Sequence, residues 1–212
     1  KLRSPMETYI DPFPQKRGEG KRATINFCNF SIPCARSGVQ ISRWGGAESE
    51  EKMAEKPVVT NAMRLLKAAG IDFETREYEV DESDLSGVHA AEVLGLPPEQ
   101  VFKTLVLRGE KQGILVCVLP VELEVDLKKL AKAAGDKKVE MIHMKELLPL
   151  TGYIRGGCSP VGMKKKYPTF LDETCELCDR IAVSAGQRGV QMLLRPADLA
   201  RYVEAKICDI AQ

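Results

Sequence analysis

The sequence predicts a mixed α/β (α+β) fold: a single compact domain in which helices surround a largely antiparallel, barrel-like sheet. Short β-rich runs alternate with single helices, without the regular strand–helix–strand rhythm of a parallel sheet. Glycine-containing connections separate several of these runs, as they do in hairpins. The chain has 212 residues, which suits one domain with an extension, and no internal repeat is visible.

Four helices are expected, each from an apolar face and a boundary residue. Thr60 is a capping residue at the start of the first helix, and Gly70 stops it. Asp126 caps the third helix, and Pro196 occupies the favoured first turn of the last. The predicted helices cover residues 61–69, 90–94, 126–134 and 196–205.

Six strands are expected where β-branched and other apolar residues gather over short runs. Residues 71–80 have two mixed faces. Residues 101–107 and 114–119 are strongly apolar and are joined by a hairpin-like connection that contains Gly109 and Gly113. Three shorter strands follow at residues 169–171, 181–184 and 190–194.

Residues 1–52 differ from the rest of the chain. Pro, Gly, Ser and Arg interrupt them, and neither helical nor strand periodicity is sustained. We interpret them as a poorly ordered N-terminal extension, either a leader or mis-assigned upstream translation, with Met53 opening the regular domain of residues 53–212. A regulatory arm is the alternative. The only tryptophan, Trp44, falls in this segment and is not expected in the main core.

Charge and hydropathy exclude several classes of protein. The longest apolar run, Gly113–Pro120, is far too short to span a bilayer, so no membrane partner is expected. Residues 1–56 carry ten Lys/Arg and seven Asp/Glu, whereas the remaining residues carry 21 and 23. A nucleic-acid partner must therefore be met by a local basic patch rather than by bulk charge.

The cysteine pattern favours a reducing cytoplasm. Seven cysteines, an odd number without a secretory signal, argue against a disulfide framework. Cys175 and Cys178 form one CxxC, but no second pair or HxH lies near enough in the sequence to complete a zinc site. We therefore expect no metal and no cofactor, and we keep a redox or metal protein that uses this pair as a rival hypothesis.

The segment 152–166, GYIRGGCSPVGMKKK, is the most informative stretch of the chain. Its glycines allow backbone N–H groups to approach a ligand, and successive N–H groups can form an anion-binding nest. Lys164, Lys165 and Lys166 follow directly and would add positive charge for a phosphate backbone. A tight turn with a solvated basic run is the alternative, since neither GxxxxGK[ST] nor GxGxxG is present.

Lys103 is the first candidate for chemistry. In the run VFKTLVL it shares one side of the predicted strand with Val101, Leu105 and Leu107. Its ammonium group must therefore either reach solvent or end in a polar cavity, where it would suit a phosphate, carboxylate or carbonyl oxygen. Thr104 faces the other side and would serve through its backbone or another wall of the cavity.

The remaining polar candidates lack the partners of a catalytic triad. His89 and His143 have no serine or cysteine arrangement beside them and are expected on the surface or at helix caps. Cys158 and Ser159 are candidate nucleophiles only if a base meets them in space. The turn SAGQRG can present Ser184 and backbone N–H groups to a ligand, or simply connect two strands.

Three motifs in order resemble the YbaK/EbsC family of Cys-tRNA(Pro) deacylases: VFKTL, then GYIRGGCSPVGMKKKYPTFLDE, then VSAGQRG followed by a strand and PADL. The resemblance runs from about Val58 to the C-terminus, and the first 52 residues have no counterpart in it. It implies a compact α/β domain on a mixed, barrel-like sheet. It also implies hydrolysis of the carboxylic ester that joins a wrongly attached amino acid, typically cysteine, to proline tRNA.

The resemblance also implies functional residues. The family's essential lysine matches Lys103, and its other catalytic and substrate-binding positions match Tyr78, Thr104, Gly156, Gly157, Ser159 and Ser184. Two departures concern the specificity for the amino acid. The aromatic residue that some members have before the helix is replaced near Ser86, and an acidic residue after the SAGxRG turn is Gln191 here.

The mechanism that the resemblance implies relies on the substrate, whose cysteine thiol attacks its own ester carbonyl. We hypothesise that the N–H groups of Gly156 and Gly157 bind the carbonyl oxygen, that Lys103 fixes the tRNA 3′ end or the polar groups of the substrate, and that Lys164–Lys166 contact phosphates. The expected partners are tRNA(Pro) charged with cysteine and prolyl-tRNA synthetase. A non-catalytic module that binds aminoacyl-tRNA or nucleotide, and a deacylase for another amino acid, are the alternatives.

Overall fold

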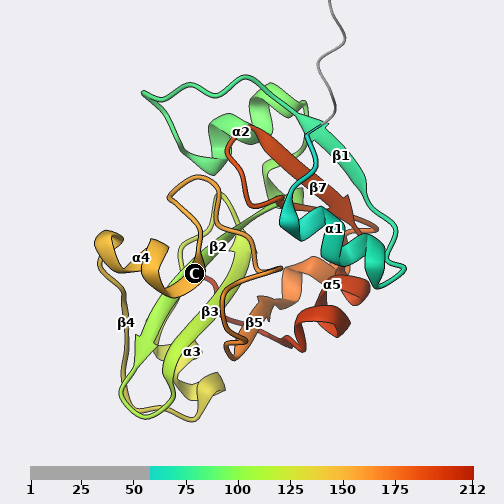
Figure 1. Cartoon of the computed structure of the whole chain (residues 1–212). Helices are drawn as coiled ribbons and strands as arrows, with labels where there is room; N and C mark the ends of the chain where they lie inside the picture. Colours follow the sequence, from blue (N-terminus) through green and yellow to red (C-terminus); the bar gives the residue numbers. More distant parts are fainter. Residues whose placement is uncertain (1–57) are drawn as a thin grey trace, which may run out of the picture. The chain divides into compact units, whose positions relative to one another are not determined.

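A computed structural model describes residues 58–212, and these fold around one eight-stranded mixed sheet (Figure 1). The strands are ordered β1-β7-β6-β2-β3-β5-β8, and β4 pairs with β2 outside this path. Their bounds are β1 Glu74–Glu77, β2 Val101–Gly109, β3 Gly113–Pro120, β4 Val139–Met141, β5 Thr169–Asp172, β6 Ile181–Ser184, β7 Val190–Leu194 and β8 Lys206–Cys208. The interpretation of residues 1–52, and of Trp44, concerns residues outside the described part of the chain.

Several helix ends within residues 58–212 lie at residues that the sequence indicated. Thr60 accepts a hydrogen bond from the N–H of Met63, and Asp126 caps α3 in the same way. Gly95 ends α2 in the left-handed conformation. The bounds are α1 Asn61–Ala68, α2 Gly87–Leu94, α3 Leu127–Ala134, α4 Met144–Thr151 and α5 Pro196–Val203, with short 3-10 helices η1 Pro98–Gln100 and η2 Glu173–Leu177.

The mixed α/β fold is confirmed, but the sheet is not closed into a barrel. Among the described strands, β1 pairs only with β7 and β8 pairs only with β5, so each forms an open edge. Four strand pairings are antiparallel and three are parallel, which makes the sheet more evenly mixed than the sequence suggested.

Several elements differ from the sequence-based prediction. The strand expected over residues 71–80 is limited to β1, whose four residues are all exposed. The hairpin is tighter than expected, because β2 continues to Gly109, which pairs with Gly113. The last helix stops at Val203, since Glu204 adopts a left-handed conformation with φ of 56°. β4, α4 and β8 were not predicted.

The two faces of the sheet carry separate cores. Val116 and Val118 of β3 face the larger core, to which α1 and α5 contribute. Leu115 and Leu119 of the same strand point the other way, toward α3. No helix within residues 58–212 is long and apolar enough to cross a membrane.

Candidate active site

A cavity of about 600 Å³ lies beside a break in the sheet, in the size range of clefts that hold drug-sized ligands. One edge of β2 pairs with β6 at Val101 and Phe102, and with β4 from Leu107 to Gly109. Between these pairings, no strand of the described residues covers that edge. The cavity occupies this break, so both faces of β2 contribute to its wall.

Thr104 sits in the middle of the break. Val101 O accepts a hydrogen bond from Val121 N, directly after β3, whereas Val106 O accepts one from Ile142 N on the opposite edge. Because backbone groups alternate along an antiparallel strand, the N–H and C=O of Thr104 point to the same edge as Val106 O. The Thr104 hydroxyl is also buried and has no hydrogen-bond partner within residues 58–212. Because neither the β4 nor the β6 pairing reaches Thr104, its N–H, C=O and hydroxyl are three polar groups at the cavity without partners among residues 58–212.

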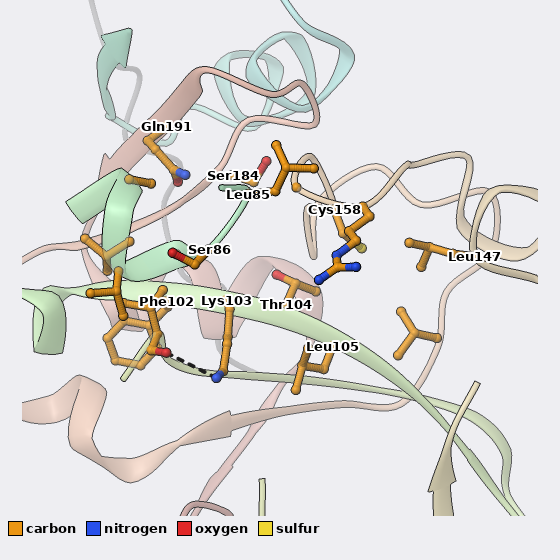
Figure 2. A pocket seen from close by; sticks show the side chains of 18 of the residues that line it. Leu85, Ser86, Phe102, Lys103, Thr104, Leu105, Leu147, Cys158, Ser184 and Gln191 are labelled. Carbon is orange, nitrogen blue, oxygen red and sulfur yellow. Dashed lines mark hydrogen bonds between the residues drawn. The ribbon is translucent and has the colours of Figure 1, made fainter. Parts of the chain in front are cut away.

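Ser184 and Gln191 contribute a second polar wall. They are direct partners across the antiparallel pair β6–β7, so their side chains lie on one face of the sheet. Gln191 is 7% exposed, and its Oε1 has no partner among the described residues. The hydroxyl of Ser184 accepts a hydrogen bond from the N–H of Gly186 at 3.2 Å. Figure 2 shows both side chains at the cavity, together with Thr104. Buried acceptors without partners indicate a site built to receive donors.

Lys103 lines the cavity but leaves β2 in a different direction from Thr104 (Figure 2). Its Nζ donates a hydrogen bond to the carbonyl of Val121 at 3.2 Å and lies 3.8 Å from the carboxylate of Glu124. The side chain is 24% exposed, so the ammonium group is only partly withdrawn from solvent. The ammonium group of Lys103 therefore finds polar partners at the rim of the cavity while part of the side chain stays in contact with solvent.

The glycine loop contributes Gly156, but not Gly157, to the lining of the cavity. Gly156 has φ of 82°, a conformation that favours glycine, and its N–H donates to no group among the described residues. The N–H of Gly157 donates to the carbonyl of Ile154 at 3.1 Å, and the residue is buried. Of these two glycines, therefore, Gly156 is the one whose N–H is not taken up by another described residue.

Ser159 and Tyr153 shape the loop from inside. The hydroxyl of Ser159, which is fully buried, accepts a hydrogen bond from Val161 N and does not line the cavity. The hydroxyl of Tyr153 donates to the carbonyl of Val161 at 2.6 Å, and its ring lies against Gly186. Ser159, which the resemblance places in the substrate pocket, here has a structural contact instead.

The two small-residue motifs pack against each other. Arg188 of the SAGQRG turn donates from Nε to the carbonyl of Arg155 at 2.9 Å. A Cβ added to Gly157 would stand 3.1 Å from the backbone N of Arg188 and 3.2 Å from the carbonyl carbon of Gln187, so the two loops touch through their main chains. The glycine loop and the SAGQRG turn therefore form one wall of the cavity, although Gly156 and Ser184 are 28 residues apart in the sequence.

Lys164, Lys165 and Lys166 do not line the cavity. Lys164 donates to the carbonyls of Leu148 and Pro149 near the end of α4, and Lys166 pairs with Glu204 at 2.7 Å. Only Lys165 has no ionic or hydrogen-bond partner within residues 58–212. Two of the three ammonium groups expected to meet phosphates are thus already occupied.

The other predicted residues divide between the cavity and structural positions. Tyr78 lines the cavity, and its N–H donates to Gly189 O at 2.8 Å. His143 caps α4, and His89 borders a smaller neighbouring hollow. Cys158 lines the main cavity, where burial raises its thiol pKa to about 12, so the thiol stays protonated near neutrality.

The CxxC pair gives no sign of a metal centre. Cys175 is buried within the main core and Cys178 is partly buried against it. Among the described residues, no group of three or more His, Cys, Asp or Glu side chains is placed to hold a metal ion.

The sequence did not identify the second half of the lining. Met141 ends β4, Ile142 follows it, Met144 and Leu147 belong to α4, and Leu105 joins them from β2. These side chains give the cavity an apolar wall in addition to the apolar residues that line it elsewhere, such as Leu85 and Phe102. Without β4 and α4, nothing in the sequence placed these side chains near Lys103. The MKELL run at the start of α4 was the available signal.

Known proteins are similar to this chain in sequence and in fold. The sequence model of the aminoacyl-tRNA editing domain family matches residues 85–202, which is more than half of the chain. The chain belongs to this family. The match covers every predicted site residue except Tyr78.

Individual relatives agree with this family assignment. An Enterococcus faecalis protein, EbsC, which carries the assignment Cys-tRNA(Pro)/Cys-tRNA(Cys) deacylase, is 47% identical over 151 residues, or 71% of this chain and 92% of the relative. A proline–tRNA ligase of Thermosipho africanus is 32% identical over 75 residues, covering 35% of this chain but 13% of the ligase. A solved structure assigned to a trans-editing enzyme for prolyl-tRNA synthetase matches with a TM-score of 0.63 and 25% identity, covering 71% of this chain and 96% of that one.

Proposed function

We propose that this editing domain hydrolyses the ester bond of cysteine wrongly attached to proline tRNA. The observation that carries the proposal is the cavity at the break in β2, where Thr104 and Gln191 hold buried oxygens that have no hydrogen-bond partner in the described part of the chain. The α-ammonium group of an aminoacyl ester has three N–H donors and would supply what these oxygens lack. The identity with EbsC supports cysteine as the amino acid and tRNA(Pro) as the carrier.

The reaction that we propose uses the thiol of the substrate as nucleophile. The sulfur attacks the carbonyl carbon of its own ester, a C–S bond forms, and the C–O bond to the ribose breaks. The proton of the thiol passes to the departing ribose oxygen, which leaves a tRNA with a free hydroxyl and a cysteine thiolactone that water then opens. Holding thiol and carbonyl together in one cavity replaces a bimolecular step with an intramolecular one.

The chain's own groups would act by position and charge. The free N–H of Gly156 would donate to the carbonyl oxygen as its negative charge develops. Gly157 and Ser159 would hold the loop in shape. Gly157 N–H donates to Ile154 O, and the hydroxyl of Ser159 accepts from Val161 N. Cys158, which stays protonated, would not compete as a nucleophile.

Lys103 would bind a polar group at the 3′ end of the tRNA. Its ammonium group is a point charge on a flexible stem and would exchange the carbonyl of Val121 and the pairing with Glu124 at 3.8 Å for an acceptor on the substrate. Lys165, with Lys164 and Lys166 after they release their present partners, would add contacts to phosphates that do not depend on sequence. Selection of tRNA(Pro) would then require shape contacts or prolyl-tRNA synthetase as a partner in the cytoplasm.

The test is a panel of proline tRNA charged with cysteine, alanine or serine, incubated with wild-type protein, with Lys103→Ala, and with Lys111→Ala as the control. Lys111 is an exposed lysine in the β2–β3 turn and does not line the cavity, so its removal changes charge alone. We expect wild type and Lys111→Ala to release cysteine at the same rate, and Lys103→Ala to be slower by about a hundredfold. If the wild-type protein released cysteine no faster than buffer alone, the hydrolase proposal would fail, and a binding module without hydrolysis would remain.

A further inference from the structure

We infer that Lys128 and Lys132, on the exposed side of α3, bind the sugar-phosphate backbone of the tRNA outside the cavity. This inference rests on the function proposed above, because the tRNA is the leaving group of that reaction. It adds a second contact surface, on the helix that covers one face of the sheet, to the site at the break in β2. The two residues are called the α3 lysine pair below.

The segment that contains α3 is locally basic. Residues 126–138, DLKKLAKAAGDKK, hold five lysines and two aspartates, a balance of +3. Residues 57–212 together hold 21 Lys/Arg and 23 Asp/Glu, a balance of −2. A nucleic-acid partner of a domain without bulk positive charge requires a local patch of this kind.

The α3 lysine pair carries the part of this charge that is available to a ligand. Both side chains are exposed, and their spacing of four residues makes them neighbours on one side of the helix, about 6 Å apart along its axis. Within residues 58–212, neither ammonium group has a hydrogen-bond or ionic partner. By contrast, Lys129 pairs with Asp209 at 2.7 Å, and Lys138 lies 3.2 Å from Glu140.

Lys103 and α3 lie on the same face of the sheet. Along β2, the side chains of Lys103, Leu105 and Leu107 share one side of the strand, and Thr104 faces the other. Leu107 packs in one core with Leu130 of α3. Figure 2 shows Lys103 leaving β2 in a different direction from Thr104. A tRNA whose 3′ end reaches Lys103 is therefore next to the face that α3 covers.

The helix α3 leads from the rim of the cavity to the hairpin end of the sheet. Glu124, whose carboxylate lies 3.8 Å from Lys103 Nζ, stands two residues before Asp126, the cap of α3. At the other end of the helix, Asp136 accepts a hydrogen bond from the N–H of Lys111 in the β2–β3 turn at 3.0 Å. The α3 lysine pair thus lies along a path that starts beside Lys103.

Phosphate is the ligand that complements this surface. A lysine ammonium is a compact point charge that attracts phosphate without reading a base. The helix sequence LKKLAKAA has no aromatic or amide side chain that could stack on a base or hydrogen-bond to its edge. Since Lys164 and Lys166 already have partners, the α3 lysine pair supplies charge that the glycine loop does not.

The test compares three double variants. Lys128→Gln/Lys132→Gln removes both charges and keeps residues that favour a helix, whereas Lys128→Arg/Lys132→Arg keeps the charges. Arg64→Gln/Lys67→Gln is the matched control. Both of its exposed cations lie on α1, which packs against the core on the opposite face of the sheet from α3.

The first measurement needs no hydrolysis. Fluorescence anisotropy gives the Kd of uncharged tRNA(Pro) over a range of salt concentrations. We expect Lys128→Gln/Lys132→Gln to weaken binding about tenfold at low salt. The slope of log Kd against log salt should decrease by about 1.4 to 1.8, since each lost phosphate contact removes about 0.7 to 0.9. The arginine variant and the α1 control should keep the slope of the wild type.

The second measurement is kcat and KM for cysteine release from Cys-tRNA(Pro) and from 3′-O-cysteinyladenosine, an ester without phosphates. We expect Lys128→Gln/Lys132→Gln to raise KM for the tRNA about tenfold with little change in kcat, and to match the wild type on the small ester. If the wild type releases cysteine from neither ester, the proposed function fails, and the Kd of the tRNA still tests the α3 surface.

Four results would overturn the α3 surface while leaving hydrolysis in place. The first is a wild-type Kd and salt slope in Lys128→Gln/Lys132→Gln. The second is an equal loss in the arginine variant, which would exclude charge as the cause. The third is an equal rise in KM for the small ester, which would mean that the variant disturbs the cavity. The fourth is an effect that occurs only when prolyl-tRNA synthetase is present, which would make this surface a protein contact.

Discussion

Arg188 Nε donates a hydrogen bond to the carbonyl oxygen of Arg155 at 2.9 Å, and this bond joins the two loops that form one wall of the cavity. The donor lies in the turn between β6 and β7, and the acceptor directly precedes Gly156. Since Arg155 C=O and Gly156 N–H belong to the same peptide unit, the bond fixes the direction of the Gly156 N–H, which donates to no group among the described residues.

Replacing Arg188 with Met keeps the apolar stem and removes the donor. We expect kcat for Cys-tRNA(Pro) to fall by roughly tenfold, because the Gly156 N–H is no longer held toward the carbonyl. The free energy of unfolding should decrease by about 1 kcal/mol, the contribution of one hydrogen bond. An Arg180→Met protein is the control, since Arg180 is an exposed arginine away from the loop. A loss of stability without any change in kcat would limit Arg188 to a structural role.

Thr104→Val exchanges the buried hydroxyl for a methyl group of the same shape. Because Oγ1 has no partner within residues 58–212, its removal should leave the free energy of unfolding unchanged or raise it by about 1 kcal/mol. Cysteine release should fall roughly tenfold, since a hydrogen bond to the substrate is lost.

Thr169→Val is the matched control for Thr104→Val. Thr169 is also buried on a strand, but its hydroxyl donates to the carbonyl of Tyr167 at 3.0 Å. This variant should lose about 1 kcal/mol of stability and keep its activity. A destabilised and fully active Thr104→Val protein would show that its hydroxyl serves the fold.

Gly156→Ala tests the amide that we assign to the carbonyl oxygen. A side chain in the left-handed region costs roughly 1–2 kcal/mol, and φ at Gly156 is 82°. Gly70→Ala carries the same backbone cost at φ of 69°, with nothing within 4 Å of the added Cβ. We expect equal falls in Tm for the two variants, measured by thermal unfolding, and a loss of deacylation only for Gly156→Ala. Equal activities would remove Gly156 from the reaction.

Burial of Cys158 predicts a stability that decreases in alkali. Burial raises its thiol pKa to about 12, whereas an unfolded thiol titrates near 8.5. The folded state therefore holds the proton more tightly, so this contribution is complete below pH of about 8.5 and is lost as the pH rises toward the folded pKa.

Urea unfolding at about pH 7.5 and pH 9.5 measures this contribution. The fall in free energy between the two values should be smaller by about 1 kcal/mol in Cys158→Ala than in wild type. Equal falls would mean that the Cys158 thiol titrates normally in the folded protein.

Most helices and strands could be predicted from the sequence because capping residues, glycines and prolines mark where they begin and end. The side chains of Thr60 and Asp126 cap the starts of α1 and α3, and Gly95 ends α2 in the left-handed conformation. β6 and β7 have the predicted limits. The open sheet could not be derived from these local signals, since closure depends on which edges remain unpaired. β1 and β8 are short strands with one neighbour each.

The site was predictable in part for a related reason. Lys103, Thr104 and Ser184 lie in motifs that the sequence displays, and all three line the cavity. The break in β2 depends on β4, which is three residues long and carries no periodic pattern. α4 was hidden by Pro149 within it. The contribution of β4 and α4 to the lining of the cavity therefore follows from tertiary packing alone.

The most direct test of the account compares cysteine with S-methylcysteine on the same proline tRNA. Both esters place a similar side chain in the cavity, but only the first carries a thiol that can attack its carbonyl. We predict that the wild-type protein releases cysteine at least about a hundredfold faster than S-methylcysteine, since the intramolecular advantage is lost with the methyl group. Equal rates for the two esters would contradict hydrolysis assisted by the substrate thiol.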